Sequence, residues 1–391
     1  MTDVFIVGAA RTPIGRFLGG LSSVSATELG AVAVRAAVER SGVDPATVED
    51  VIIGNVVQAG VGQAPARQAA LRAGLPSSAS ATTINKVCAS GLEAINSAAL
   101  SIRQGDAELI VAGGMESMSN APHLLAGARQ GIRLGAGQLE DAVIRDGLWC
   151  AFENHHMGNA AEATAEKHGI SRAELDEYAL NSHRKALDAT EAGRFDTEIA
   201  PVTTAGRKPT TITVDESPRA DTSLDALAKL RPAFLPDGVV TAGNAPGLTD
   251  GAAALIVASE AAVRDQNLTP LARVVAHATA ACDPLWLFDA PVLAIQKLLK
   301  KTGTSLDDYD LIEVNEAFAA QILANGKSLG WDWDRVNVNG GAIALGHPIG
   351  ATGARIVVTL LHALKQRGLK RGMAGLCHGG GGAVAMSFEL V

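Results

Sequence analysis

The sequence predicts an α/β protein in which strands and helices alternate, and three observations support this fold class. Short apolar runs that end in glycine, typical of buried strands, are separated by amphipathic stretches that are typical of helices. The 391 residues correspond to two or three domains of about 150 residues each. Hydrophobic residues make up 47% of the chain and charged residues 19%, which excludes a largely disordered chain.

The first part of the chain begins as strand, helix and strand. We expect strands at Val4–Gly8 and Asp50–Gly54, with an amphipathic helix at Ala26–Ser41 between them. A helix over Glu93–Arg103 and a buried strand over Ala107–Gly114 follow. Alternation of this kind predicts parallel sheets, with active groups at strand ends and helix N-termini.

The last part of the chain repeats the same scheme. We expect strands at Leu271–Ala280, Leu311–Asn315 and Met373–Cys377, and helices at Ala290–Lys301 and Gly353–Arg367. This repetition predicts two copies of one unit. The alternative is a coincidental likeness between two α/β segments.

The segment between the two copies, from Met115 to about Pro246, has many charged residues and reads as an inserted lobe. It contains the Pro/Thr-rich stretch Pro201–Thr213, a loop-like stretch over Arg129–Gly137 and a predicted helix at Tyr178–Arg194. Insertions over an α/β core commonly supply a lid for a ligand.

Charge and composition exclude several function classes. The formal net charge is −8 and there is no basic tract, which argues against nucleic acid as a partner. The long uncharged stretch Val336–Ala354 is rich in Gly and Asn, so we expect no membrane-spanning helix. The chain enters a strand pattern at its start without features of a targeting peptide, so we expect a cytoplasmic protein.

Four scattered cysteines are too few for a disulfide framework, and none has a C-x-x-C spacing that would suggest zinc. Cys88 stands where a turn enters a helix, a position that lowers the pKa of a thiol and favours a nucleophile. The alternative is an inert core cysteine. Cys150 and Cys282 lack flanking glycines or basic residues and are interpreted as packing residues.

Two further residues combine reactive side chains with glycine-rich surroundings. His347 lies between Gly346 and Gly350 at a predicted helix start, although a histidine bonded within a tight turn would look the same. Cys377 ends a buried strand and precedes four glycines, whose amides could point at a developing oxyanion. Two cysteines and one histidine suit acyl transfer.

Two other kinds of site fit the sequence poorly. The segment Gly341-Ala-Ile-Ala-Leu-Gly346 continues as His-Pro rather than Lys-Ser/Thr, which disfavours a nucleotide-phosphate loop. His123, His155 and His156 have no carboxylate at the usual helical metal spacing, so we expect no metal site.

Several long motifs together resemble the thiolases, and the resemblance covers essentially the whole chain. The motifs are Asn85-Lys-Val-Cys-Ala-Ser-Gly91, Gly113-Gly-Met-Glu-Ser-Met118, Asn315-Glu-Ala-Phe-Ala319, the stretch Asn339–Arg355, and Cys377-His-Gly-Gly-Gly381. The resemblance implies a thiolase fold of two similar βαβαβαββ halves related by a pseudo-twofold, with an inserted loop domain. We place the N-terminal half at 1–118 plus 246–270, the loop domain at 119–245 and the C-terminal half at 271–391.

The resemblance also implies the chemistry. Cys88 would carry the acyl group, His347 would activate it, and Cys377 would exchange a proton with the α-carbon of the second acetyl-CoA. Asn315 would position a water near the enolate oxygen. The backbone N–H groups of Cys88 and Gly379 would hold the oxyanion of the acyl group.

The implied activity is the reversible condensation of two acetyl-CoA to acetoacetyl-CoA and CoA, or thiolysis of a 3-ketoacyl-CoA. A broad-range degradative thiolase of fatty-acid oxidation is the alternative. A decarboxylating condensing enzyme of the same superfamily is disfavoured, because it would leave Cys377 without a role. A catalytically silent acyl-CoA-binding protein is disfavoured as well, because it could tolerate loss of Cys88 or His347 and both are present.

Acyl-CoA and coenzyme A are implied as substrates, with no separate cofactor. Residues of the loop domain and its borders are expected to contact them, with Arg219 facing a phosphate or the adenine: Leu148, His156, Met157, Arg219, Phe234, Ala245, Pro246 and Phe318. The excursion Pro122–Asp146 resembles the tetramerisation loop of biosynthetic thiolases, so we expect a homotetramer built from dimers.

Three departures from the family pattern affect the substrate site. Pro246 stands where a serine usually contacts the pantetheine, and His378 and Gly382 replace common apolar residues. Leu285–Pro291 replaces a Met-Gly-Thr-Gly-Pro turn, which adds volume and removes backbone freedom from the acyl wall. We expect a short pocket for acetyl and acetoacetyl groups; the alternative is a loop that swings outward and admits longer chains.

Overall fold

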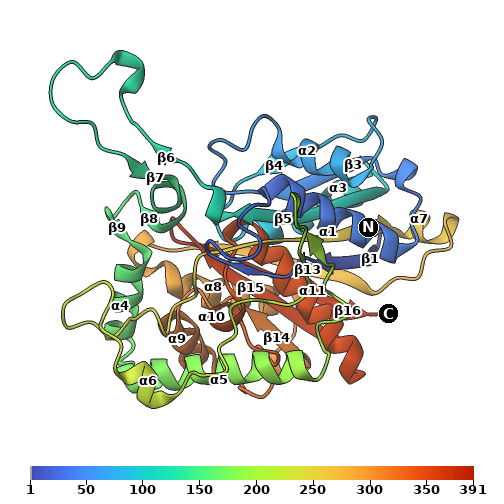
Figure 1. The fold of residues 1–391 in the computed structure, drawn as a ribbon. Helices are drawn as coiled ribbons and strands as arrows, with labels where there is room; N and C mark the ends of the chain where they lie inside the picture. Colours follow the sequence, from blue (N-terminus) through green and yellow to red (C-terminus); the bar gives the residue numbers. More distant parts are fainter. Residues whose placement is uncertain (1) are drawn as a thin grey trace.

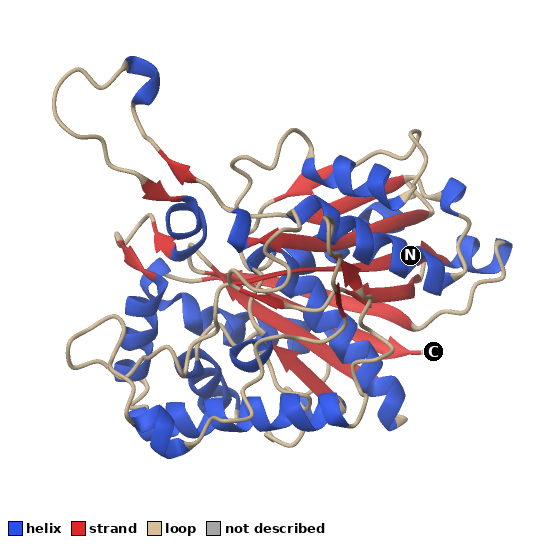
Figure 2. Cartoon of the chain, in the orientation of Figure 1, coloured by secondary structure: helices blue, strands red, loops and turns tan. Residues whose placement is uncertain are grey.

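The computed structural model describes residues 2–391, and one mixed ten-stranded sheet runs through its centre (Figure 1 and Figure 2). Its strands are β1 (Val4–Arg11), β2 (Gly15–Arg16), β3 (Asp50–Gly54), β4 (Thr82–Ile84), β5 (Leu109–Ser117), β12 (Thr249–Ser259), β13 (Ala272–Ala281), β14 (Leu311–Val314), β15 (Arg371–His378) and β16 (Gly382–Leu390). The spatial order is β14-β15-β16-β13-β1-β12-β5-β3-β4, and β2 pairs with β12.

The strand order confirms the two similar halves. Outward from the β1–β13 contact, the sheet continues through β12, β5 and β3 on one side and through β16, β15 and β14 on the other. In each half the outer pair, β3 with β5 or β14 with β15, is parallel, whereas the inner pairs are antiparallel. The two halves meet where Phe5 of β1 pairs with Arg273 of β13.

The expectation of parallel sheets is therefore wrong for the inner strands. The sequence interpretation did not identify β12 and β16, which add an antiparallel strand to each half. A short turn joins β15 to β16, and only antiparallel strands can be joined so tightly. Gly380 and Gly381 make this turn with φ of 86° and 88°, a conformation that glycine adopts readily.

Helices α3 (Ser90–Gln104) and α11 (Ile349–Arg367) pack against each other beside the sheet. Their crossing is unusually close, since a Cβ on Gly91 would lie 2.6 Å from the Ala354 backbone nitrogen. A Cβ on Gly353 would lie 2.3 Å from the Leu92 backbone nitrogen. This contact brings together the segments that precede the two helices, which contain Cys88 and His347.

The other helices of the two halves cover the sheet from outside. Helix α1 (Ala26–Ser41) begins with a capping box formed by Ser25 and Glu28, and its bounds are those predicted from the sequence. It packs with α2 (Pro65–Ala73) over the N-terminal half, while α8 (Ala290–Thr302) covers β13 and β16. Separate buried apolar clusters lie under each of these layers.

The α-helices of the inserted segment form a lobe on the C-terminal half, to the lower left in Figure 1. Helix α4 (Met157–Lys167) packs on α9 (Ala319–Leu329), and α5 (Arg172–Glu191) packs on α9 and α10 (Ala342–Leu345). The remaining short elements of the inserted segment are β6 (His123–Leu124), β7 (Glu140–Asp141), β8 (Trp149–Cys150), β9 (His155–His156), β10 (Val202–Thr203), β11 (Thr211–Ile212) and α6 (Leu224–Ala228).

Helix α5 differs from the predicted helix at Tyr178–Arg194. It begins two turns earlier, because the side chain of Ser171 and that of Glu174 form a capping box at its start. It ends at Glu191, before a turn that contains Gly193.

Candidate active site

A cavity of about 480 Å³ lies where the two halves and the inserted lobe meet. Cys88, His347, Cys377 and Gly379 all line it, although they are far apart in the sequence. Asn315 lies behind His347, with its amide nitrogen 3.4 Å from His347 Nε2. The residues expected to contact coenzyme A line the same cavity: Leu148, His156, Met157, Arg219, Phe234, Ala245, Pro246 and Phe318.

Cys88 is presented by a strained turn immediately before α3. Val87 has a φ of 49°, a left-handed conformation that is unfavourable for a β-branched residue. The turn is held by side chains, because Val87 N donates to Asn85 Oδ1 and Ser90 Oγ donates to the Val87 carbonyl. Cys88 as a residue is only partly exposed, and it lines the cavity from a fixed backbone.

The expectation that the helix start lowers the pKa of Cys88 is wrong in direction. Burial of the thiol raises its pKa to about 12, because desolvation penalises the thiolate. Backbone hydrogen bonds from Cys88 and Gly379 act in the opposite direction but do not overcome burial. The resting thiol is therefore protonated and needs a base beside it.

The surroundings of His347 favour the tautomer that such a base requires. The Thr352 hydroxyl lies 3.0 Å from the Pro348 carbonyl and 2.7 Å from His347 Nδ1, and when it donates its single proton to Pro348 its oxygen accepts from Nδ1–H. This leaves the lone pair on Nε2, toward which the Asn315 amide donates. Burial, and secondarily the charge of Arg355, lowers the pKa of His347 to about 3, so the ring is neutral at neutral pH.

Cys377 is a second thiol at the same end of the cavity. It is buried in the last residues of β15, and desolvation followed by the nearby Cys88 raises its pKa well above the ordinary value. A thiol in this environment holds its proton tightly, and its thiolate is a strong base.

His378 and Gly382, which both depart from the apolar residues common in the family pattern, are explained together by their contact in the turn after Cys377. A Cβ on Gly382 would lie 2.2 Å from His378 Nε2, so the imidazole occupies the space that a side chain at 382 would need. His378 Nδ1 lies 2.8 Å from the Gly379 carbonyl oxygen, which restrains the residue whose N–H is directed at the Cys88 sulfur.

Asn315 is fully buried in the turn that follows β14, and its backbone N–H donates to the Gly375 carbonyl of β15. Its amide nitrogen faces His347. Its Oδ1 atom has no hydrogen-bond partner among residues 2–391. A buried carbonyl oxygen of this kind is suited to accept a hydrogen bond from a water or a substrate.

Glu116 is a functional candidate to which the sequence analysis gave no role, although its motif was noted. The fully buried carboxylate accepts four hydrogen bonds from N–H groups: from Asn55 Nδ2 (2.8 Å) and from the backbone of Val56 (3.0 Å), Val57 (3.2 Å) and Gly350 (3.0 Å). Gly350 is in the first turn of α11, directly after His347. Glu116 therefore fastens the N-terminal half to the helix start that orients the histidine.

Glu116→Gln is expected to lower kcat while KM for the acyl substrate stays within about twofold. The amide NH2 would face backbone N–H groups and displace the start of α11, and a 1 Å misplacement of a catalytic group can cost about 10²-fold in rate. Steady-state kinetics and thermal melting of the variant test this. Glu162→Gln is the matched control, because Glu162 is also buried and accepts two backbone N–H bonds from Val239 and Val240. Equal kcat losses in both variants would refute the role of Glu116.

One wall of the cavity is a series of aromatic rings. His156 stacks on Phe234 at a centroid distance of 4.8 Å, and Phe234 meets the edge of Phe318 at 6.2 Å. Phe318 meets Phe288 at 5.5 Å. Phe234 can approach α4 because the helix has Gly158 there, where a Cβ would lie 2.3 Å from the ring.

The changed segment Leu285–Pro291 turns inward. Leu287 and Phe288 line the cavity and are each only 2% exposed. The sequence predicts a changed wall at this segment but not the direction in which the wall turns. Several other apolar lining residues were not identified, because they carry no chemical signal: Met118, Ile144, Leu248, Ala317 and Ile349.

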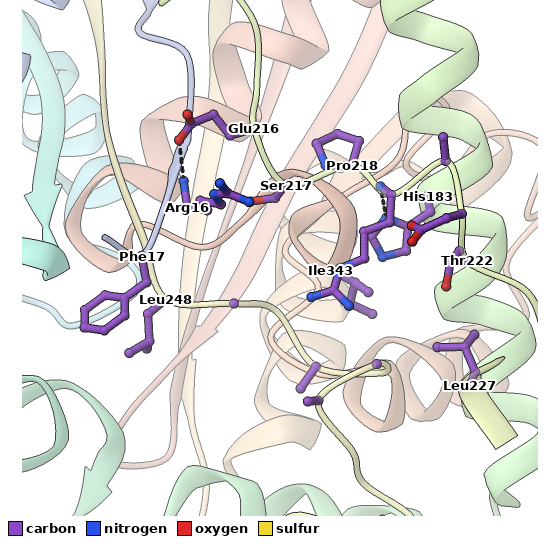
Figure 3. A pocket seen from close by; sticks show the side chains of 17 residues that line it. Arg16, Phe17, His183, Glu216, Ser217, Pro218, Thr222, Leu227, Leu248 and Ile343 are labelled. Carbon is purple, nitrogen blue, oxygen red and sulfur yellow. Dashed lines mark hydrogen bonds between the residues drawn. The ribbon is translucent and has the colours of Figure 1, made fainter. Parts of the chain in front are cut away.

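A second cavity of about 520 Å³ adjoins the first (Figure 3) and shares Arg219 and Ala245 with it. Arg16 and His183 also line this second cavity. The Arg219 backbone N–H donates to His183 Nδ1 at 3.2 Å, and burial lowers the pKa of His183 to about 4. The arginines therefore supply the positive charge at this end of the combined space.

Cys150 lies in the apolar core of the lobe, and Cys282 packs beside β13, as expected for packing residues. Across residues 2–391, no group of three His, Cys, Asp or Glu side chains is arranged to hold a metal ion. No helix of that range combines the length and apolarity needed to cross a membrane.

Comparison with known proteins gives full-length matches. Residues 4–261 match the family model described as thiolase, N-terminal domain, and residues 268–390 match thiolase, C-terminal domain. An acetyl-CoA acetyltransferase of Pseudomonas aeruginosa is 54% identical over 389 residues, 99% of each chain. One of Escherichia coli K12 is 54% identical over 391 residues, covering 100% of this chain and 99% of that protein. The crystal structure of the Bacillus anthracis acetyl-CoA acetyltransferase is similar with a TM-score of 0.98 at 47% identity, covering 100% and 99% of the two chains.

Proposed function

The chain belongs to the thiolase family, and from this premise we propose that it is an acyltransferase that condenses two acetyl-CoA into acetoacetyl-CoA and CoA, reversibly. The observation that carries the proposal is the meeting of Cys88, His347 and Cys377 at one end of a single cavity. Full-length similarity to acetyl-CoA acetyltransferases supports the same substrate.

In the first half-reaction, His347 Nε2 takes the proton of Cys88 and the sulfur attacks the carbonyl carbon of acetyl-CoA. The pair must act together, because the isolated thiol has a raised pKa. The backbone N–H groups of Cys88 and Gly379 would stabilise the oxyanion of the tetrahedral intermediate, and their lowering effect on the pKa of Cys88 supports this role. The C–S bond to coenzyme A then breaks, the leaving thiolate takes the proton from His347, and acetyl-Cys88 remains.

In the second half-reaction, Cys377 passes its proton to His347 Nε2, and the resulting thiolate removes a proton from the α-carbon of a second acetyl-CoA. The enolate oxygen would be held by His347 Nε2–H and by a water bound to Asn315, whose Oδ1 is available for it. The enolate carbon attacks acetyl-Cys88, a carbon–carbon bond forms, the C–S bond to Cys88 breaks, and the Cys88 thiolate takes the proton from His347. In the thiolysis direction Cys377 returns its proton to the enolate carbon.

Coenzyme A would extend from the thiols along the aromatic wall to Arg219. Pro246 supplies only apolar contact where the family pattern has a serine hydroxyl. As part of the same proposal, the reaction uses no bound metal or organic cofactor, because thiol, imidazole and amide groups of the chain account for each step.

We propose a preference for short acyl chains, and the thiolysis of C4 and C10 3-ketoacyl-CoA is the experiment that tests it. Leu287 and Phe288 occupy the space into which a longer chain would extend. Forcing methylenes into a packed site costs roughly 1–3 kcal/mol, so kcat/KM should favour C4 by about 10- to 100-fold. Equal or faster turnover of C10 would instead indicate the broad-range degradative enzyme. Absence of acetoacetyl-CoA cleavage would remove the proposed function itself.

We also propose a homotetramer built from dimers. The hairpin between β6 and β7 projects away from the body of the molecule at the upper left of Figure 1. Its tip exposes apolar side chains, and Leu134 is 98% exposed. Light scattering is expected to give four times the 40.1 kDa chain mass, and Leu134→Asp is expected to give dimers. A native monomer would contradict this proposal.

A further inference from the structure

A chain of three buried hydrogen bonds runs behind the acyl wall, outside the cavity. The backbone N–H of Ala317 donates to Gln321 Oε1 (3.0 Å), Gln321 Nε2 donates to Asn325 Oδ1 (2.7 Å), and Asn325 Nδ2 donates to the Phe288 carbonyl (2.7 Å). Gln321 and Asn325 lie one turn apart on α9, and both are fully buried. Neither side chain lines the cavity.

This relay joins two parts of the site that are distant in sequence. Ala317 is two residues from Asn315, and its neighbour Phe318 packs against Phe288. Phe288 is thus restrained at two points. Its ring packs against Phe318, and its carbonyl accepts from Asn325, which is linked through Gln321 to Ala317. The position of the wall is therefore fixed relative to the catalytic turn.

The outer side of the same segment is held more weakly. Asp289 forms ion pairs with Lys167 and His168 at 2.8 Å, and Lys167 lies 4.1 Å from the Trp286 ring centroid. These groups are partly exposed, so each pair contributes little. The hydrogen bond from Asn325 to the Phe288 carbonyl is different because it is buried. A buried carbonyl that loses its donor is left desolvated and unpaired, which is unfavourable.

Resting on the proposed function, we propose that Asn325 is a positioning residue that sets acyl-chain length by holding the Phe288 backbone inside the cavity. Without the Asn325 donor, the carbonyl of Phe288 regains a partner by turning toward solvent. The ring then leaves the end of the acyl pocket and admits additional methylenes. The thiols and His347 are not part of this movement.

The test is the ratio of kcat/KM for thiolysis of C8 to that of C4 3-ketoacyl-CoA in four proteins. These are the native chain, Asn325→Asp, Phe288→Ala and the double variant. Asn325→Asp keeps an acceptor for Gln321 and removes the donor to Phe288. We expect it to raise the C8/C4 ratio about tenfold, equivalent to about 1.4 kcal/mol, mainly through KM. Because the relay acts through Phe288, Asn325→Asp should add nothing to the ratio of Phe288→Ala.

Two further variants keep the test decisive. Gln321→Glu retains the acceptor for Ala317 and loses the donor to Asn325, so a smaller increase in the ratio is expected. Gln366→Leu is the control. It removes a hydrogen bond that the Gln366 side-chain amide donates to the Arg194 carbonyl (2.7 Å), far from the cavity, and it should leave the ratio unchanged.

The outcomes separate this inference from the proposed function. A native protein that does not cleave acetoacetyl-CoA overturns the proposed function. A native protein that does, with a folded Asn325→Asp variant whose ratio stays within twofold of native, overturns the role of Asn325 alone. Additive effects in the double variant also overturn it. Where Asn325→Asp does not fold, an unchanged ratio in Gln321→Glu has the same meaning.

Discussion

Cys88→Ala is expected to abolish acyl-enzyme formation and to lower turnover by about 10⁴-fold or more, as loss of a covalent nucleophile does elsewhere. Cys377 cannot substitute for it, because that thiol is buried and its pKa is raised well above its ordinary value. Cys150 and Cys282 lie outside the cavity lining. Among the cysteines of residues 2–391, only Cys88 follows a non-glycine residue with a positive φ, which is Val87.

Intact-protein and peptide mass spectrometry after incubation with acetyl-CoA measures this result. The native chain should gain one acetyl group on Cys88, and the variant should gain none. Cys282→Ala is a suitable control, because it removes another partly exposed thiol without changing the site. An acetyl adduct on Cys150 or Cys282 of the native protein would show that the nucleophile is assigned to the wrong residue.

Cys377→Ala is expected to separate the two half-reactions. In the proposed mechanism, acylation of Cys88 needs only His347 and the two backbone N–H groups, so it should continue. Carbon–carbon bond formation should fall by about 10²- to 10⁴-fold, the usual contribution of a positioned acid or base.

The measurement pairs acetyl-enzyme formation with the rate of acetoacetyl-CoA appearance in the same preparation. Exchange of the α-hydrogens of acetyl-CoA with deuterated water gives a third readout, because it requires the base but no new carbon–carbon bond. It should be lost in Cys377→Ala and retained in Cys282→Ala. Condensation at the native rate in Cys377→Ala would rule out its role as the base.

The fold could be predicted where the sequence has a period or a cap. Helix α1 was located to the residue because its apolar face follows the helical repeat and is preceded by Ser25. Strand β12 was not identified. All eleven of its residues are buried, so its alanine-rich run has no alternation and resembles a buried helix segment.

The site could be predicted where residues carry distinctive chemistry beside unusual backbone. Cys88, His347 and Cys377 have such surroundings, and the structure brings them to one cavity. The pKa of Cys88 could not be predicted, because a helix start is visible in sequence whereas desolvation depends on residues from both halves. For the same reason the hydrogen bonds of Glu116 and Asn325 appear only when distant segments are placed in contact.

The glycine crossing of α3 and α11 limits how this protein can change over evolutionary time. The smallest replacement of either glycine adds a methyl group, and at Gly91 or Gly353 that methyl would meet backbone rather than a side chain that can rotate away. Such a mutation would push α3 and α11 apart and increase the distance between Cys88 and His347, although both residues would still be present. A second mutation nearby could not relieve the clash, because the obstructing atoms belong to the backbone. Descendants of this chain are therefore free to acquire new substrates at the acyl wall, where side chains meet side chains, but they inherit the crossing unchanged.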